Sequence, residues 1–342
     1  MLIKPACAVL LVGIIVFCPI GSLINAQEVA RLTLRVRDRV AITTENEAPF
    51  EEPVKCDADG NIYVHPYASP SPMAAPVLRI SHEGKRTGTF SITSVPEFEK
   101  SGTFDFAFGL RGEVYLISMN AKGKQIVAFE ANGQYHDTVK LEGDFLPEQL
   151  AVNSSGAFLV GGYKQKDNRA TGTPFTGIFD QSGRLVRELD LPGDLNPGKD
   201  AAAKPKDAPL DPAISMSNVV AADDGNFYIM RASAPPVVYV IAPDGSVAHR
   251  FKINPPGDGF VAGVMKAGGG KIVVEFYKAA KGQAPAEQLY SVQDSMTGER
   301  FANYLLPPEM LHGGAFACYT PNGFTFIDAN ANRQLEFVTT TP

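Results

Sequence analysis

The chain lacks the motifs that identify many catalytic and nucleotide-binding proteins. It contains no Walker loop, no dinucleotide-binding fingerprint, no cysteine–histidine zinc pattern and no Gly-x-Ser-x-Gly element. Blocks of like charge are also missing, so a charged tail or a membrane-binding patch is not indicated. The formal charge is −6, and such an acidic chain lacks the basic face that nucleic acid requires. Nucleic acid is therefore not an expected partner.

Long apolar runs are missing beyond the N-terminus. Lys4 precedes an apolar run over residues 6–20, and small residues follow up to Ala26. A basic start, an apolar centre and a small residue at the cut site predict a signal peptide, residues 1–26. The run is shorter than the ~20 residues that span a bilayer. We expect a secreted or periplasmic protein, residues 27–342, with no membrane span after cleavage and a formal charge of −7 once Lys4 is removed.

Helical periodicity is nearly absent, and a repeated glycine turn takes its place. Six runs share the pattern of a glycine followed, three and four residues later, by aromatic or aliphatic residues: Gly60-Asn-Ile-Tyr-Val, Gly112-Glu-Val-Tyr-Leu, Gly156-Ala-Phe-Leu-Val, Gly225-Asn-Phe-Tyr-Ile, Gly270-Lys-Ile-Val-Val and Gly323-Phe-Thr-Phe-Ile. Five of them are followed by a second glycine turn, at Gly84, Gly133, Gly183, Gly245 and Gly298. One sheet of strands a, b, c and d used six times predicts an all-β, six-bladed β-propeller in a single domain.

The last repeat is one strand short. Residues 31–36 alternate polar and apolar side chains, the period of a half-buried strand, and have no turn partner of their own. Placed as the outer strand of blade six, this N-terminal strand would cover an open sheet edge and close the ring by a three-plus-one arrangement. Residues 193–211 are rich in Pro, Ala, Lys and Asp, which predicts a flexible insertion between blades three and four.

Three of the repeats carry a more specific signature. Asp57-Ala-Asp-Gly-Asn-Ile-Tyr-Val, Asp223-Asp-Gly-Asn-Phe-Tyr-Ile and the stretch from Asn322 to Asn332-Arg333 resemble the NHL-type repeats of six-bladed propellers. The Asn-x-Arg element of that family is only approximated here, so the likeness is to a divergent member. The resemblance implies a propeller fold, but such families include binding scaffolds, lactone hydrolases and lyases, so it does not select a function.

Two cysteines, Cys56 and Cys318, follow the predicted signal peptide. They lie near the ends of the first strands of blades one and six, which are neighbours in a closed ring. A disulfide would fasten the ring in an oxidising compartment. Two buried thiols are the alternative, because inner strands of adjacent blades can hold their Cα atoms beyond ~7 Å.

Candidate site residues are those placed at the face of a propeller that carries the b-to-c and d-to-a connections. They are His65, Tyr67, Arg231, Glu275, His312 and Asp328.

These residues lead to two hypotheses about function. In the first, the protein is a monomeric binding protein without a cofactor that recognises a protein, peptide or glycan there, or a structural propeller of a larger assembly. In the second, His65, His312 and Asp328 hold a divalent metal for hydrolase or lyase chemistry. The Asp328-Ala-Asn330-Ala-Asn332 stretch lacks the glycine of a calcium loop, which favours a simple turn.

Overall fold

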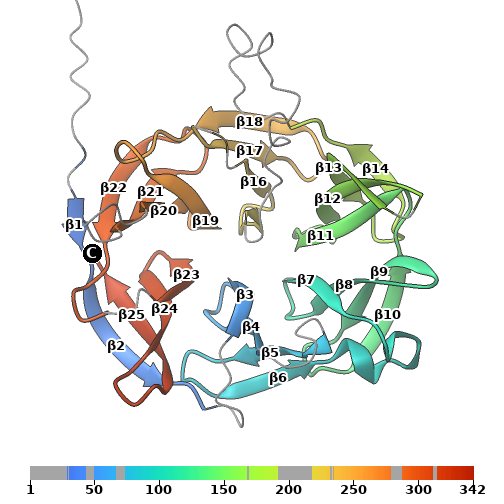
Figure 1. The fold of residues 1–342 in the computed structure, drawn as a ribbon, viewed down its shortest axis with the longest axis horizontal. Helices are drawn as coiled ribbons and strands as arrows, with labels where there is room; N and C mark the ends of the chain where they lie inside the picture. Colours follow the sequence, from blue (N-terminus) through green and yellow to red (C-terminus); the bar gives the residue numbers. More distant parts are fainter. Residues whose placement is uncertain are drawn as a thin grey trace, which may run out of the picture.

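The structure is a computed structural model that describes residues 29, 31–43, 50–66, 74–167, 169–191, 218–231, 233, 235–278, 287–310 and 314–342. These residues form six sheets in a ring around a central axis, which confirms the predicted six-bladed β-propeller (Figure 1). The predicted signal peptide and the predicted insertion at 193–211 lie outside the described residues. Within the described ranges, no helix has the length and apolar character needed to cross a membrane.

The four strands a to d of each blade pair antiparallel, and the a strand is nearest the axis (Figure 1). Blade one contains β3 (Phe50–Cys56), β4 (Ile62–Pro66), β5 (Val77–Ile80) and β6 (Arg86–Phe90); blade two contains β7 (Thr103–Phe108), β8 (Val114–Asn120), β9 (Gly123–Phe129) and β10 (Tyr135–Lys140). Blade three contains β11 (Phe145–Val152), β12 (Phe158–Lys166), β13 (Arg169–Phe179) and β14 (Leu185–Glu188); blade four contains β15 (Val219–Ala221), β16 (Phe227–Arg231), β17 (Val237–Ile241) and β18 (Val247–Lys252). Blade five contains β19 (Val261–Gly268), β20 (Lys271–Lys278), β21 (Glu287–Asp294) and β22 (Arg300–Leu305); blade six contains β23 (Ala315–Thr320), β24 (Gly323–Ala329), β25 (Leu335–Thr341) and β2 (Arg35–Ala41).

The hydrophobic core consists of layers between neighbouring blades. Successive side chains of a strand point to opposite faces of its sheet. Tyr63 of β4 therefore packs toward blade two, whereas Ile62 and Val64 of the same strand pack toward blade six. The same division applies around the ring, and six buried clusters each join two adjacent blades. This explains why the b strands read as continuous apolar runs rather than alternating ones.

In blades one to five, the second glycine of the repeat contributes to the contact between blades. The glycine lies in the turn between strands c and d and has a positive φ. A Cβ atom at Gly133 of blade two would stand 2.6 Å from the carbonyl oxygen of Thr89 in blade one. Gly84, Gly183, Gly245 and Gly298 likewise lie against the preceding blade. Only glycine combines this backbone conformation with so close an approach.

The N-terminal segment completes the ring differently from the predicted strand at 31–36. The outer strand of blade six is β2, which pairs antiparallel with β25 over residues 35–41. Ahead of it, β1 (Arg31–Thr33) pairs parallel with β22 as a fifth strand of blade five. Leu34 lies between the two strands and is buried in the core between blades five and six. The alternation in the sequence therefore marks two short strands that cross the boundary between these blades.

The two ends of the blades form two faces. The a–b face carries the turns between strands a and b, and the b–c face carries the b-to-c turns and the d-to-a connections. The connection from blade one to blade two includes the 3-10 helices η2 (Ile92–Ser94) and η3 (Pro96–Phe98), which bury Ile92 and Phe98. A disulfide between Cys56 and Cys318 joins β3 and β23 near the a–b face, with the two Cα atoms 5.5 Å apart.

Candidate functional site

His65, a predicted site residue, lies at the end of β4 and is only 6% exposed. Its ring contacts that of Phe106, with the centroids 5.6 Å apart. Neither ring nitrogen has a hydrogen-bond partner of normal geometry among the described residues. Burial lowers the pKa of His65 to about 4, the nearby backbone of Ala75 opposes this change, and the positive charge of Lys55 adds to it. The imidazole is therefore neutral at pH 7 and lies beneath the surface of the b–c face.

Arg231, at the end of β16, is also buried, with 3% of its surface exposed. Its charge acts on Tyr163 of blade three, whose pKa is raised by burial and by Glu148 and lowered by Arg231. Arg231 is the last residue of β16, as the repeat pattern predicts, whereas Tyr163 lies within β12, which continues to Lys166. The guanidinium thus belongs to the boundary between blades three and four.

The two acidic site residues lie in other surroundings. Glu275, in β20, accepts a hydrogen bond from the side-chain amide of Gln288 in the same blade. Asp328, at the end of β24, is 5% exposed, and its Oδ1 accepts a hydrogen bond from the backbone N–H of Ala329. Asn330 caps the following turn by accepting from the backbone N–H groups of Asn332 and Gln334, which agrees with the simple turn that the sequence favours.

The described part of the chain does not bring the predicted residues into a metal centre. No group of three or more His, Cys, Asp or Glu within it is arranged to hold a metal ion. Tyr67 and His312, however, lie outside the described residues. The site at His65, His312 and Asp328 therefore stays a prediction.

The central channel contains a buried ion pair between Lys55 of β3 and Asp105 of β7, 2.8 Å apart. The Lys55 ammonium also donates to the carbonyl oxygen of Leu150 in blade three, 3.1 Å away. Asp105 accepts from the backbone N–H groups of Phe106 and Leu150, each at 2.7 Å. Burial lowers the pKa of Lys55 and raises that of Asp105. Because these hydrogen bonds satisfy both charges, the pair connects the inner strands of blades one, two and three.

A second lysine crosses the channel from blade five. Lys266 of β19 is buried and donates a hydrogen bond to the carbonyl oxygen of Val54 in blade one. Lys55 and Lys266 occupy equivalent positions in their blades, one residue farther from the a–b face than Cys56 and Ala267. Blade six supplies Cys318 at the same level, in the disulfide with Cys56. The polar and sulfur groups of this layer therefore hold the inner strands together.

The a–b face has a cavity of about 650 Å³ at the mouth of the channel. All six a–b turns contribute to its wall. Its charged rim includes Asp57, Asp59, Arg79, Arg111 and Asp223. Asp57 is used in the turn itself, since its Oδ1 accepts from the backbone N–H groups of Asp59 and Asn61. The rim thus offers both signs of charge around a concave surface.

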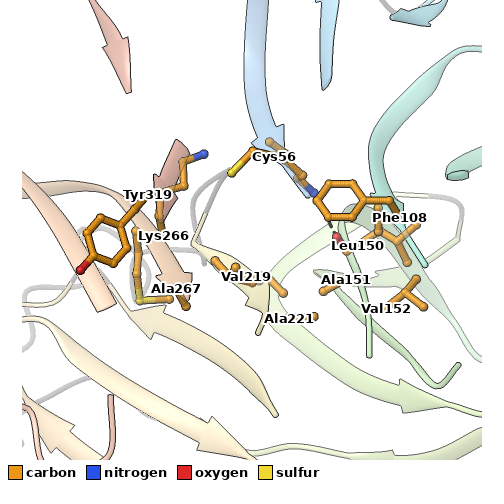
Figure 2. A pocket seen from close by; sticks show the side chains of 14 residues that line it. Cys56, Phe108, Leu150, Ala151, Val152, Val219, Ala221, Lys266, Ala267 and Tyr319 are labelled. Carbon is orange, nitrogen blue, oxygen red and sulfur yellow. Dashed lines mark hydrogen bonds between the residues drawn. The ribbon is translucent and has the colours of Figure 1, made fainter. Parts of the chain in front are cut away.

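The mouth continues inward into a narrower space of about 80 Å³ (Figure 2). Phe108, Val152, Ala221, Ala267 and Tyr319 line this space, each from a different inner strand. Lys55 and Lys266 also line it, so the apolar ring is followed by a layer of lysines. The combination is an open polar funnel with an apolar base.

Sequence reasoning directed attention to the b–c face and missed this cavity. The signal was nevertheless present in the repeat. The lining residue stands four positions before the turn glycine in five blades, as at Cys56, Phe108, Val152, Ala221 and Tyr319, and three positions before Gly270 at Ala267. Aligning these positions would have shown a mainly apolar ring. Its depth and volume depend on how the blades tilt, which the spacing of turns does not encode.

Comparison with known proteins identifies the fold alone. No protein-family model matches the sequence, and no curated protein matches it. A protein from Bacteroides fragilis named as an exported protein is 8% identical, with a TM-score of 0.50 over 90% of this chain and 95% of that one. A protein of unknown function from Bacteroides caccae is 12% identical, with a TM-score of 0.45 over 74% and 80% of the two chains. Virginiamycin B lyase from Staphylococcus aureus is 11% identical, with a TM-score of 0.41 over 76% and 96%.

Proposed function

We propose that this protein is an exported binding protein whose partner docks at the channel mouth on the a–b face. The observation that carries the proposal is the cavity of about 650 Å³ bounded by the six a–b turns. Binding sites are characteristically concave, with an apolar lining and a few polar groups that fix orientation, and occupy roughly 300–1,000 Å³. The mouth has this volume and this distribution of groups.

The choice of face moves the site away from the one the sequence favoured. On the b–c face, His65, Arg231 and Asp328 are buried, and Glu275 is engaged by Gln288. On the a–b face, by contrast, Arg111 and Asp59 are exposed on the rim of an open cavity. Exposed groups around a concavity favour recognition more than buried ones do.

The chemistry of the mouth favours a protein or peptide over a glycan among the partners that the sequence left open. The base is formed largely by apolar side chains, so a ligand gains most by bringing an apolar group to it. The rim carries Arg79 and Arg111 as well as Asp59 and Asp223. A polypeptide can offer apolar side chains, main-chain polar groups and both charges together.

Two further features support an exported protein. The first is the predicted signal peptide at residues 1–26. The second is the disulfide between Cys56 and Cys318, because structural disulfides persist mainly in oxidising compartments such as the periplasm and the cell exterior. Secretion or residence in the periplasm accounts for both.

The test uses the mature chain, residues 27–342, and two probes: a phage-displayed library of linear peptides and a printed glycan array. Leu110→Glu and Arg111→Glu alter the rim, and Val247→Glu alters an exposed valine of an outer strand as the matched control. We expect bound peptides to lose affinity for both rim variants and to bind the control normally. Ligands that bind all three variants equally would place the site elsewhere. The same holds for ligands that require Tyr277, an exposed residue near the end of β20 on the b–c face.

A metal-dependent hydrolase or lyase is the second candidate, favoured by one observation at His65. Its ring is buried and neutral at pH 7, with neither nitrogen in a hydrogen bond of normal geometry among the described residues, and a neutral imidazole is the form that binds a metal. Metal analysis of protein purified without chelators, then repeated after incubation with Zn²⁺ and dialysis, tests this candidate. A stoichiometric ion that is lost in His65→Ala and in His312→Ala supports it. Metal-free protein after both treatments rejects it.

A further inference from the structure

The apolar base of the mouth suggests how a partner is anchored, provided that the proposed function holds. We propose that the partner is a protein segment that inserts one uncharged, aliphatic side chain into the channel between Phe108, Ala221, Ala267 and Tyr319. The space there is about 80 Å³, which suits a single short side chain rather than a chain segment. The larger funnel outside it accommodates the flanking residues of the same segment.

The ring around this space is asymmetric. At equivalent positions, blades two and six carry the large side chains of Phe108 and Tyr319, whereas blades four and five carry Ala221 and Ala267 (Figure 2). The Tyr319 ring is turned away from the space and packs beside Phe324, so the Phe108 ring is the aromatic surface that faces the space. The methyl groups of Ala221 and Ala267 are smaller than the side chains at the same position in the neighbouring blades. They leave room on the side of the channel formed by blades four and five. An inserted aliphatic group would contact aromatic carbon on one side and alanine methyls on the other. Apolar surface that is open to water gains from such a contact.

The inner end of the space determines which side chains fit. Lys55 and Lys266 line the layer beyond the apolar ring, and their ammonium groups bond across the channel to Leu150 and Val54. A lysine or arginine inserted from the mouth would bring a third positive charge toward two buried ones. A carboxylate would lose its hydration beside ammonium groups that already have partners. Aliphatic side chains avoid both costs.

The rim indicates a polypeptide as the occupant. Leu110 stands at the mouth with 78% of its surface exposed, in the turn that also carries the exposed side chain of Arg111. An exposed leucine beside a hole with an apolar base, surrounded by charges of both signs, has the apolar centre and polar rim of a protein-binding surface. A small apolar molecule would leave these rim groups unused.

The experiment fills the hole and leaves the rim intact. Ala267→Leu replaces a methyl group by an isobutyl group in the apolar base, and Ala221→Leu does the same from the next blade, so that one variant can replace the other if it fails to fold. Val247→Leu, on an exposed outer strand, is the control for an added methylene. Thermal unfolding of each variant verifies that it is folded. The probes are the peptides selected from the phage-displayed library on the unmodified mature chain.

The expected result has three parts. The selected peptides share an aliphatic residue, and replacing it by alanine or lysine weakens binding by about tenfold or more. Ala267→Leu or Ala221→Leu weakens binding of the original peptides by a similar factor, whereas Val247→Leu changes it by less than about twofold.

The outcomes separate this inference from the proposed function. If Leu110→Glu abolishes binding while both filled variants bind normally, the mouth is used but the anchor is refuted. If neither the rim nor the channel variants affect binding, both proposals fail. A selection that returns no peptide, or peptides without a required aliphatic residue, also overturns the anchor.

Discussion

Cys56 and Cys318 stand in the inner strands of the first and last blades and are joined by a disulfide across the seam of the ring. At the outer edge of the same seam, β2 pairs with β25, so the N-terminal segment closes the ring a second time. The disulfide lies next to the channel, and the β2–β25 pairing lies at the outer edge of the ring. The first and last blades are therefore held together at both their inner and their outer strands.

Removing the disulfide should lower stability without changing the fold. The bridge closes a loop across 262 residues of sequence, and constraining so long a loop in the unfolded chain contributes about 2–5 kcal/mol to the free energy of unfolding. We expect the double variant Cys56→Ala/Cys318→Ala to lose roughly this amount in urea unfolding. Oxidised wild-type protein treated with a reductant should move toward the same midpoint. Equal stability of the variant and the oxidised protein would show that the outer closure alone holds the ring.

The N-terminal segment should be required for cooperative folding. Deleting residues 27–40 removes β1 and most of β2, and leaves the edge of β25 unpaired and the core between blades five and six uncovered at Leu34. A point substitution isolates this contribution. Leu34, 1% exposed, should cost about 2–4 kcal/mol when replaced by alanine, whereas Leu32, 45% exposed, should cost less than about 1 kcal/mol. Thermal unfolding measures both, and an unchanged transition in the deletion variant would contradict the closure.

The turn glycines allow the contact between blades to be measured separately from backbone strain. Gly133 and Gly60 have similar φ angles of 87° and 79°. A Cβ atom at Gly133 would meet the Thr89 carbonyl at 2.6 Å, whereas a Cβ atom at Gly60 would meet nothing within 4 Å. Gly60→Ala therefore reports the cost of the left-handed backbone, about 1 kcal/mol. We expect Gly133→Ala to cost at least about 1 kcal/mol more in urea unfolding, because blade one must move. Equal losses would mean that the blades adjust freely.

Sequence reasoning reached the architecture because the fold repeats a local rule. Each blade has a turn that needs glycine, followed by a strand buried on both faces. The sequence therefore shows the same pattern six times, as at Gly60-Asn-Ile-Tyr63-Val64 and Gly225-Asn-Phe-Tyr-Ile. The N-terminal strand was found because residues 31–36 alternate, but alternation does not specify a partner. The assignment of β1 to blade five and β2 to blade six depends on where Leu34 packs, which is a property of the assembled ring.

The site was harder to predict because exposure is not a local property. His65 and Asp328 end b strands, as their spacing predicts, yet the packing of neighbouring blades buries both. The lysines of the channel gave no sequence signal, since Lys55 and Lys266 find their partners in strands 50 and 212 residues away. A buried charge becomes recognisable only when its partner is placed beside it.

The Lys55–Asp105 pair should be costly to break from one side. Lys55→Met leaves the Asp105 carboxylate buried without its counter-ion, and such a loss typically destabilises by about 3–5 kcal/mol. Lys55→Met/Asp105→Leu removes both charges, and we expect it to recover part of that loss, although the backbone N–H groups of Phe106 and Leu150 then lose their acceptor. Urea unfolding of the two single variants and the double variant gives the coupling energy. Additive losses would show that the two side chains act independently.

His65 should make stability depend on pH. Its pKa is about 4 in the folded chain because of burial, and its ordinary value is 6.5, so unfolding takes up a proton at pH values between the two. Stability from this group is therefore complete above pH 6.5 and declines as the pH falls toward 4. The expected loss between pH 7.5 and pH 5 is about 2 kcal/mol. The His65→Gln variant lacks the titrating ring, so its free energy of unfolding should fall by about 2 kcal/mol less than that of the wild type over this range. The control variant His249→Gln, on the exposed strand β18, should behave like the wild type. The measurement is the urea unfolding free energy of the three proteins at both pH values. Parallel losses in all three would mean that the ring of His65 is accessible to protons in the folded state.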